Sequence, residues 1–557
     1  MNTNKWGLML LSVMMVLSIV LSGCAKEAKP PSPSGAGTIV DGGREKVNGE
    51  EKEKETAADS NLNPSGFPIV KEPISLTFFT GKDATNSNKF EETLVWQEYA
   101  KKSNIQVNFQ LVPFESLTEK RNLALASGDY PDVFYTARLS ANDLMKYGSQ
   151  QKVLIPLNDL IDQYAPNFKK LLDQYPDLRK GLTMPDGNIY SFPTFYSPDF
   201  LPVLIGTPLW INKKWLDQLN MQEPQTIEDF YKYLQAVKTT DLNGNGQADE
   251  IPYSGSSVNV IKYQFQGSWG LGNRGLGHLY IDMDPDKDQL RFYRLDPKYK
   301  EVLEFIHKLY AEELIDPEIF TIKDAAFRAK GAEGNLGSAI TNNAGTAFNL
   351  DHYVGLGALK GPHGDQLYSH VGVPLVQPGS MAITNKNKYP EATVRWMDYF
   401  YGNEGALFYF MGIEGVTYTK KPDGSLEYVE DITNNPNGLT MTQARTKYFT
   451  WNGGSYPAIV QEEYFPMQSS SIEAGKKVAD YKPTEIWNRF TYTEEESEFM
   501  TSVGADIQTF ILETEAKLIA GDMSFDEWDK YTDTVKKMGL DKYMEIEKAA
   551  YERYKSN

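Results

Sequence analysis

The alternation of strand-like and helix-like segments early in the globular sequence restricts the fold strongly. Residues 74–80 (ISLTFFT) are rich in β-branched and aromatic side chains, whereas residues 89–103 (KFEETLVWQEYAKKS) carry apolar positions at helical spacing. Residues 104–112 (NIQVNFQLV) alternate as a strand does, and a further helical segment leads to a short buried strand at 132–135. This order predicts an α/β fold with a parallel sheet that is covered by helices on both faces.

The same alternation returns further along the chain. Residues 203–219 predict a strand followed by a helix, and residues 226–239 predict a helix with a threonine cap and an acidic first turn. Residues 388–410 predict a helix that begins at a proline and a second helix behind it, and residues 498–554 predict helix almost throughout. Because the 557 residues exceed what one hydrophobic core accommodates, two or more domains are expected.

The first 24 residues are typical of an export signal. Lys5 is followed by an apolar run at positions 6–21 and then by Leu-Ser-Gly-Cys, which ends at Cys24. The run is short for a permanent membrane span but suits a signal peptide at 1–23. Cys24 is the only cysteine in the chain, so the folded part is expected to have no disulfide and to depend on its core.

A polar segment follows the signal at residues 24–68. It contains almost no large apolar side chain, so it cannot bury enough surface to offset the entropy of ordering. We therefore expect a disordered tether before a folded body that begins at 69. The formal net charge of −19 disfavours nucleic acid and anionic membrane surfaces as partners, because Lys and Arg bind both.

The segment DLNGNGQADEIPY, residues 241–253, predicts a structural calcium loop. Its oxygen-bearing side chains occur at alternate positions, with a glycine at the sharp turn. Pro252 occupies the position where an EF-hand carries its bidentate glutamate, and Glu250 is the available substitute. The candidate ligands are Asp241, Asn243, Asn245, Gln247, Asp249 and Glu250.

Other interpretations of this loop are a different metal or a plain turn. Mg²⁺ is disfavoured because it requires a stricter octahedron, and zinc is disfavoured because the loop offers no His or Cys. An Asn-Gly turn between a helix and a strand would suit the same residues without a cation. In that case, however, the carboxylates of Asp241, Asp249 and Glu250 would repel one another within one small loop.

Several longer segments follow one another in a characteristic order: SGDYPDVFY, VLIPLNDLIDQY, PDGNIYSFPTFY, LWINKKWLDQL, PQTIEDFYKYLQAVK, AITNKNKYPEATVRWMDYFYGNEG and LIAGDMSFDEWDKY. Across residues 74–554 this order resembles that of extracellular solute-binding proteins of the family 1 type. The resemblance is greatest to large lipoprotein binders of Gram-positive bacteria and to calcium-containing binders of acidic oligosaccharides. Leu-Ser-Gly-Cys resembles the lipobox, whose cysteine is diacylated and becomes the mature N-terminus.

The family resemblance implies a periplasmic-binding-protein-like fold of two α/β lobes, joined by a hinge that the chain crosses several times. The expected crossings lie near 192–195, 338–341 and 381–384. The expected bounds are 69–195 with 345–383 for the first lobe, and 196–344 with 384–557 for the second. The resemblance also implies a calcium site at 241–250, which would stabilise the second lobe.

The resemblance implies a receptor of an ABC importer that is anchored by acyl chains, such as palmitate, to the outer face of the cell membrane. Its expected partners are an oligosaccharide and the transmembrane permease subunits, and it is expected to be a monomer that does not bind nucleic acid. A peptide or another polar oligomer is the alternative ligand. A polysaccharide-degrading enzyme is the alternative class, although the five histidines show no metal motif and no nucleophile or nucleotide motif occurs.

Aromatic residues near the expected hinge are candidate platforms for sugar rings, whose C–H faces stack on aromatic side chains. Trp269 is the most specific of them, because it lies between Gly267 and Gly270, where helix packing is not expected to account for it. The full set is Phe195, Tyr196, Trp269, Phe348, Tyr353 and Trp451. Packing in a core is the alternative for each of them. Core positions are expected for Trp96, Trp210, Trp215, Trp396 and Trp528.

Overall fold

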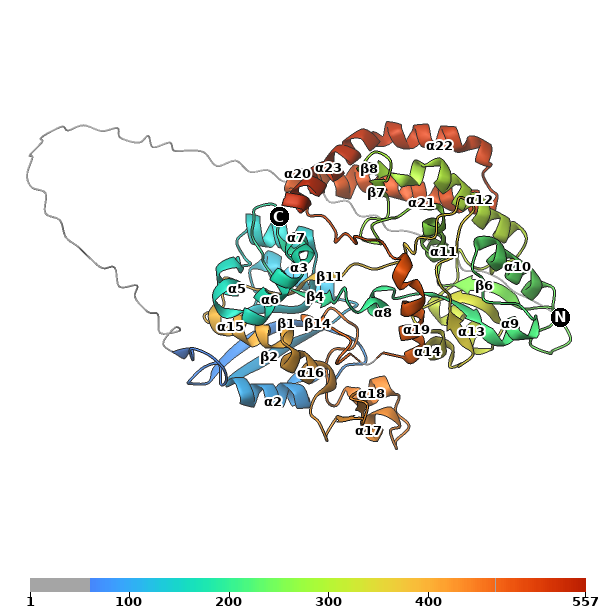
Figure 1. Ribbon diagram of the computed structural model, residues 1–557. Coiled ribbons are helices and arrows are strands. Elements are labelled where there is room, and N and C mark those ends of the chain that lie inside the picture. Colours follow the sequence, from blue (N-terminus) through green and yellow to red (C-terminus); the bar gives the residue numbers. More distant parts are fainter. Residues whose placement is uncertain (1–60, 466, 557) are drawn as a thin grey trace, which may run out of the picture. The chain divides into compact units, whose positions relative to one another are not determined.

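The computed structural model describes residues 61–465 and 467–556 (Figure 1). The predicted signal peptide, Cys24 and most of the predicted tether lie outside the described residues. Within the described ranges, no helix combines the length and the apolar character that crossing a membrane requires.

A six-stranded mixed sheet organises the first body, which we define as this sheet and the helices packed on it (Figure 1). The sheet has the order β14-β4-β11-β3-β1-β2. Its strands are β1 (Ile74–Lys82), β2 (Ile105–Pro113), β3 (Val133–Leu139), β4 (Phe192–Tyr196), β11 (Leu375–Ile383) and β14 (Ala458–Val460). β1 pairs in parallel with β2 and β3, as predicted, whereas β11 is antiparallel to β3 and β4.

The core of the first body is rich in aromatic side chains. Trp96 on α2 (Leu94–Ser103) stacks on Trp396 of α15 (Pro390–Asp398), with ring centroids 5.5 Å apart and 15° between the planes. Phe78 of β1 meets the Trp396 ring edge-on at 5.2 Å. The apolar side chains whose spacing predicts helix at 89–103 and 388–410 therefore lie on the faces of α2 and α15 that pack on the sheet.

A four-stranded sheet organises the second body, again defined with its helices, in the order β10-β5-β9-β6. Its strands are β5 (Leu209–Asn212), β6 (Ile251–Gly255), β9 (Leu336–Ile340) and β10 (Tyr353–Gly355). The predicted threonine cap is confirmed at α10 (Ile227–Lys238), where Thr226 and Asp229 form a reciprocal capping box. The core positions predicted for five tryptophans are also confirmed, with at most 7 % exposure: Trp96, Trp210, Trp215, Trp396 and Trp528.

The remaining helices are α3 (Leu117–Ser127), α4 (Ala141–Leu144), α5 (Asn158–Tyr164), α6 (Pro166–Gln174), α7 (Pro176–Leu182), α8 (Leu201–Leu204), α9 (Lys213–Gln218), α11 (Val258–Phe265), α12 (Pro297–Ala311), α13 (Asp324–Ala332), α14 (Ala344–Phe348), α16 (Asn403–Met411), α17 (Glu430–Thr433), α18 (Met441–Arg445), α19 (Ser469–Val478), α20 (Glu494–Phe499), α21 (Ala505–Ala520), α22 (Trp528–Val535) and α23 (Asp541–Ser556). The remaining strands form two hairpins, β7 (Ile281–Asp284) with β8 (Gln289–Phe292), and β12 (Tyr418–Lys420) with β13 (Leu426–Tyr428). The predicted helical tail is present as α20 to α23.

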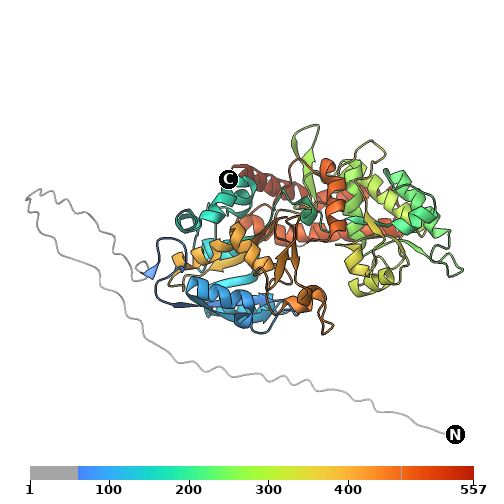
Figure 2. The same ribbon diagram turned by 60° about the horizontal axis from the view of Figure 1, so that its bottom comes forward.

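The chain passes between the two bodies more than once. It leaves the six-stranded sheet after β4, returns to it at β11, and leaves again after β14 for α19, which packs beside β10. At the end of the chain, α23 comes back to lie beside α7 of the first body (Figure 2). The links between the two sheets are therefore 197–208 and 356–374. The expected crossings at 192–195, 338–341 and 381–384 lie largely within strands.

The sheets divide the chain differently from the predicted lobe bounds. Strand β10 belongs to the four-stranded sheet, although 345–383 was expected in the first lobe. Helices α15 and α16 and strand β14 pack on the six-stranded sheet, although 384–557 was expected in the second. Periodicity identifies the type of an element but not the sheet on which its apolar face packs, and this explains the difference.

The folded part also begins before residue 69. Asn63 donates its backbone N–H to the Ile69 carbonyl at 2.9 Å, and Leu62 forms a β-bridge with Val70. The Phe67 ring lies 5.2 Å from the Tyr399 ring at an angle of 85°. Residues 61–68 are therefore attached to the first body, because these contacts offset the polar composition on which the predicted tether rested.

Candidate functional site

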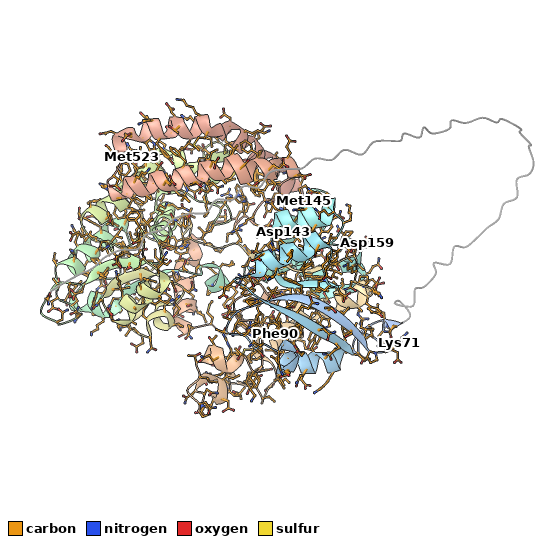
Figure 3. All side chains as sticks on the ribbon, turned by 180° about the vertical axis from the view of Figure 1, so that it is seen from behind. Lys71, Phe90, Asp143, Met145, Asp159 and Met523 are labelled. Carbon is orange, nitrogen blue, oxygen red and sulfur yellow. The ribbon has the colours of Figure 1, made fainter. Side chains whose placement is uncertain are left out.

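A cavity of about 510 Å³ lies where the first body faces the second. The first body contributes the end of β3 with the start of α4, and the start of β11. The second body contributes the loop before β7, the segment before α20, and parts of α21 and α23. The polar and aromatic lining residues include Arg138, Asn142, Gln377, His278, Tyr280, Arg489, Phe490, Tyr492, Gln508, Tyr543 and Glu547. Figure 3 shows the side chains between the ribbons and labels Asp143 and Met145, just beyond β3.

A buried carboxyl group forms part of the cavity wall. Glu547 on α23 is 2 % exposed, and its Oε2 accepts a hydrogen bond from Tyr492 Oη at 3.0 Å. Burial raises the pKa of Glu547 to about 7. This group therefore changes its charge near neutral pH, in contrast to an ordinary glutamate.

His278 lies beside this carboxyl group. Its Nδ1 is 4.0 Å from Glu547 Oε2, and its Nε2 is 3.2 Å from the Asn488 carbonyl oxygen, so Nε2 carries the proton. Burial lowers the pKa of His278 to about 4. The imidazole is consequently neutral at physiological pH, and it donates to the protein backbone.

Aromatic faces and amides complete the lining. Phe490 packs on His278 with ring centroids 3.9 Å apart, and Tyr280 is 9 % exposed. Gln377 and Gln508 are half-buried and line the cavity from the two bodies. Gln377 Nε2 donates to the Leu139 carbonyl at 2.8 Å and Gln508 Nε2 to Tyr543 Oη at 3.4 Å, which leaves their amide oxygens to accept from a ligand. Apolar faces combined with a few oriented polar groups are typical of a small-molecule site.

The cavity rim contains a strained backbone at the end of β3. Thr136 and Arg138 have φ values of 47° and 52°, which non-glycine residues rarely adopt. The Arg138 guanidinium stacks on Phe114 at 3.6 Å, and it donates from Nε to Ser455 Oγ at 2.9 Å and from Nη2 to the Gly453 carbonyl at 3.1 Å. These contacts hold Arg138 in one orientation at the rim.

The predicted aromatic platforms lie elsewhere. Five of the six are buried in the cores, at 1–8 % exposure: Phe195, Trp269, Phe348, Tyr353 and Trp451. Tyr196 is half-buried against the first core. Phe195 lines a separate cavity of about 300 Å³ together with Tyr175 and Asp199. The structure therefore does not bring the six residues together at one site.

Trp269 illustrates why the expectation for this set fails. Contrary to the prediction, packing does account for it, because its ring lies 5.8 Å from Phe305 of α12 and its Nε1 donates to Glu301 Oε2 at 3.0 Å. Gly267 lies within the short 3-10 helix Gln266–Trp269 and Gly270 caps its end, and a Cβ at Gly267 would come within 2.1 Å of the Leu367 carbonyl oxygen. These glycines permit close packing and do not expose the ring.

In the predicted calcium loop, the carboxylates of Asp241 and Asp249 accept hydrogen bonds from other groups of the same loop. Asp241 accepts backbone N–H groups from Gly244 at 2.7 Å and from Gly246 at 2.8 Å, and both glycines have positive φ. Asn245 Nδ2 donates to Asp249 Oδ1 at 3.0 Å. Within the described ranges, His, Cys, Asp and Glu side chains form no group of three or more with metal-binding geometry.

Glu250 is the residue of this loop that fits a cation best. It is 3 % exposed, and its Oε1 accepts the N–H groups of Leu242 and Asn243. Its Oε2 is buried and has no hydrogen-bond partner in the structure. A buried carboxylate oxygen without a partner is costly, and a calcium ion bound by the loop would satisfy it.

Comparison with known proteins agrees with this architecture. The family model described as bacterial extracellular solute-binding protein matches residues 84–407. The fructooligosaccharide ABC transporter substrate-binding protein FusA of Streptococcus pneumoniae is 30 % identical over 531 residues, which cover 91 % of this chain and 95 % of FusA. Two solved structures of FusA are similar to this chain, one with kestose and one of an EF-hand mutant with fructo-nystose. Each is 28 % identical in sequence, has a TM-score of 0.71, and covers 87 % of this chain and 100 % of the FusA chain.

A more distant protein shares the fold. An extracellular solute-binding protein from Bifidobacterium longum subsp. infantis is 20 % identical, with a TM-score of 0.73 and coverage of 87 % of this chain and 98 % of its own. The predicted two-lobe α/β architecture is thus confirmed at the level of the fold. The chain belongs to the bacterial extracellular solute-binding protein family.

Proposed function

We propose that this protein is the receptor of an ABC importer and captures an oligosaccharide outside the cell. The observation that carries the proposal is its similarity to FusA, a fructooligosaccharide-binding protein, over 91 % of the chain. Similarity over that length includes both bodies and the links between them.

The cavity between the two bodies is the proposed sugar site. Tyr280 and Phe490 supply apolar faces for sugar rings, while Gln377 and Gln508 supply amides for hydroxyl groups. Since the two amides come from different bodies, a ligand that contacts both would stabilise a closed arrangement of the two bodies. The bodies would then act as lobes, and the permease would recognise the closed state.

The receptor performs no chemistry on its ligand in this proposal. A thermal-shift screen of the full chain against oligosaccharides and peptides, with product analysis of each mixture, tests the statement. We expect a rise in melting temperature with one class of oligosaccharide and intact sugar at the end. Stabilisation by peptides alone, or release of shorter sugars, would contradict it.

Calcium binding to the loop at 241–250 is part of the proposal. The candidate ligands are Asp241, Asn243, Asn245, Gln247, Asp249 and Glu250. The unpartnered Oε2 of Glu250 supports the site, as does the EF-hand named in a FusA mutant. The ion would have a structural role, joining the end of α10 to the start of β6.

Anchoring through Cys24 is also part of the proposal. Two acyl chains would hold the protein on the outer face of the membrane, since each buried CH₂ contributes about 0.8 kcal/mol. Contacts of Asn63 and Phe67 attach the described start of the chain to the first body. We propose that the receptor is a monomer on this tether.

A further inference from the structure

We infer that the ligand of the cavity is an oligosaccharide that carries an anionic group, a carboxylate or a sulfate, bound by Arg138 and Arg489. This inference rests on the proposed function and specifies its substrate class. The two arginines lie at the cavity on different bodies, Arg138 at the end of β3 and Arg489 on the segment before α20. A ligand that neutralises both would therefore also connect the two bodies.

The first observation is that neither guanidinium forms an ion pair. Most arginines in the described part of the chain contact a carboxylate within 4 Å: Arg121, Arg179, Arg274, Arg291, Arg294, Arg328 and Arg553. Arg138 donates only to a hydroxyl and a carbonyl group, and no hydrogen bond or ion pair of Arg489 occurs among the described residues. Two arginines without a carboxylate partner therefore lie at this one cavity.

The second observation is that the other groups in the wall do not cancel this charge. Glu547 is the carboxyl group that lines the cavity. It accepts a hydrogen bond from Tyr492, and burial raises its pKa. His278 is neutral because burial lowers its pKa. Burial also lowers the pKa of Arg138, and Coulombic attraction by Asp83 opposes this effect. The ion-paired Arg291, in contrast, has a raised pKa. Among the described residues, no carboxylate lies within 4 Å of either guanidinium, and Glu547 is the carboxyl group that shares the cavity wall with them.

The third observation is that the Arg138 guanidinium is fixed in place and that the backbone beside Arg489 is held. Arg138 is stacked on Phe114 and hydrogen-bonded to the 453–455 loop. The Arg489 side chain is exposed, whereas its neighbour Asn488 is only 1 % exposed. Asn488 anchors this segment because its side chain accepts the Leu375 N–H at 3.0 Å and donates to the Asp177 carbonyl at 2.7 Å. The preorganised Arg138 guanidinium can bind a planar carboxylate or a sulfate at little entropic cost, and the exposed Arg489 side chain extends from a held backbone.

Isothermal titration calorimetry on the full chain in detergent tests the inference. The probes are trigalacturonate, the neutral galactotriose of the same linkage, a sulfated galactan trisaccharide and kestose. We expect an anionic probe to bind at least tenfold more tightly than its neutral counterpart, and 0.5 M NaCl to reduce this preference. The carboxylate and sulfate probes distinguish the two kinds of anion.

Variants show whether the two arginines cause the preference. Arg489→Gln should reduce the anionic-to-neutral affinity ratio about tenfold, as expected for loss of one charged contact. Arg138→Gln should have a similar effect. Arg328→Gln is the matched control, because Arg328 is an exposed arginine on α13, ion-paired with Asp324 outside the cavity. Since Arg489 has no contact to lose, its variant remains informative if Arg138→Gln does not fold.

The outcomes separate this inference from the proposed function. Binding of kestose or galactotriose without preference for the charged probes, or a preference unchanged in both variants, would overturn the inference and leave an oligosaccharide receptor. Failure of all charged and neutral oligosaccharides to bind would contradict the proposed function, and the inference with it.

Discussion

Tyr492 Oη donates a hydrogen bond to Glu547 Oε2 at 3.0 Å and so joins the segment before α20 to α23 within the cavity wall. The carboxyl group is 2 % exposed, and burial raises its pKa to about 7. The folded protein consequently holds this proton more tightly than the unfolded chain does. The pair couples the stability of the cavity wall to pH.

The first prediction concerns this pH dependence. Because the folded-state pKa of Glu547 is raised, its contribution to stability should be lost as the pH rises from about 4.5 to about 7. Glu547→Gln keeps an acceptor for Tyr492 but cannot ionise, so it should remove this part of the pH dependence. The loss should reach a few kcal/mol, since one pKa unit corresponds to about 1.4 kcal/mol. Urea unfolding at several pH values measures it, and an unchanged slope in the variant would refute the role of Glu547.

The second prediction concerns Trp269, which is 3 % exposed in the second core. Trp269→Ala should lower the free energy of unfolding by about 3–5 kcal/mol, as for large core aromatics, while sugar affinity measured well below the melting temperature stays the same. Val416→Ala, at a side chain with 49 % exposure, is the control and should change little. An unchanged melting temperature with lost affinity would instead support the stacking role predicted from the sequence.

The alternation of strands and helices, the cap at Thr226 and the buried tryptophans were predictable because each depends on local spacing. The cavity was not predictable in this way. Arg138, Gln377, Arg489 and Glu547 lie far apart in the sequence, and only the pairing of the sheets and the return of α23 bring their segments together. Glu547 in particular occupies helical sequence, where a carboxylate normally indicates a solvent-exposed face.

The third prediction concerns calcium. EDTA should lower the melting temperature of the wild type, because a ligand that binds only the folded state adds about 2.7 kcal/mol at a hundredfold excess over its Kd. Asp241→Ala with Asp249→Ala should melt early and no longer respond to EDTA. Asp423→Ala alters an aspartate in another glycine-containing turn and should keep the response. Identical melting curves with and without EDTA at several calcium concentrations would favour a plain turn.

The fourth prediction concerns the anchor. Cys24→Ser should abolish acylation, so the protein should be released into the medium or remain as an uncleaved precursor. Cell fractionation and metabolic labelling with a palmitate analogue measure both. A variant that still sediments with membranes as a processed lipoprotein would rule out the anchor at Cys24.

The last prediction concerns the proposed binding of an oligosaccharide in the cavity between the two bodies. Calorimetric titration of the double variant Gln377→Ala, Gln508→Ala with the best oligosaccharide from the screen tests it most directly, because each body loses one amide. Gln235→Ala, at an exposed glutamine on α10, is the control. We expect at least tenfold weaker binding in the double variant, about 1.4 kcal/mol, and wild-type affinity in the control. Wild-type affinity in a correctly folded double variant would contradict it.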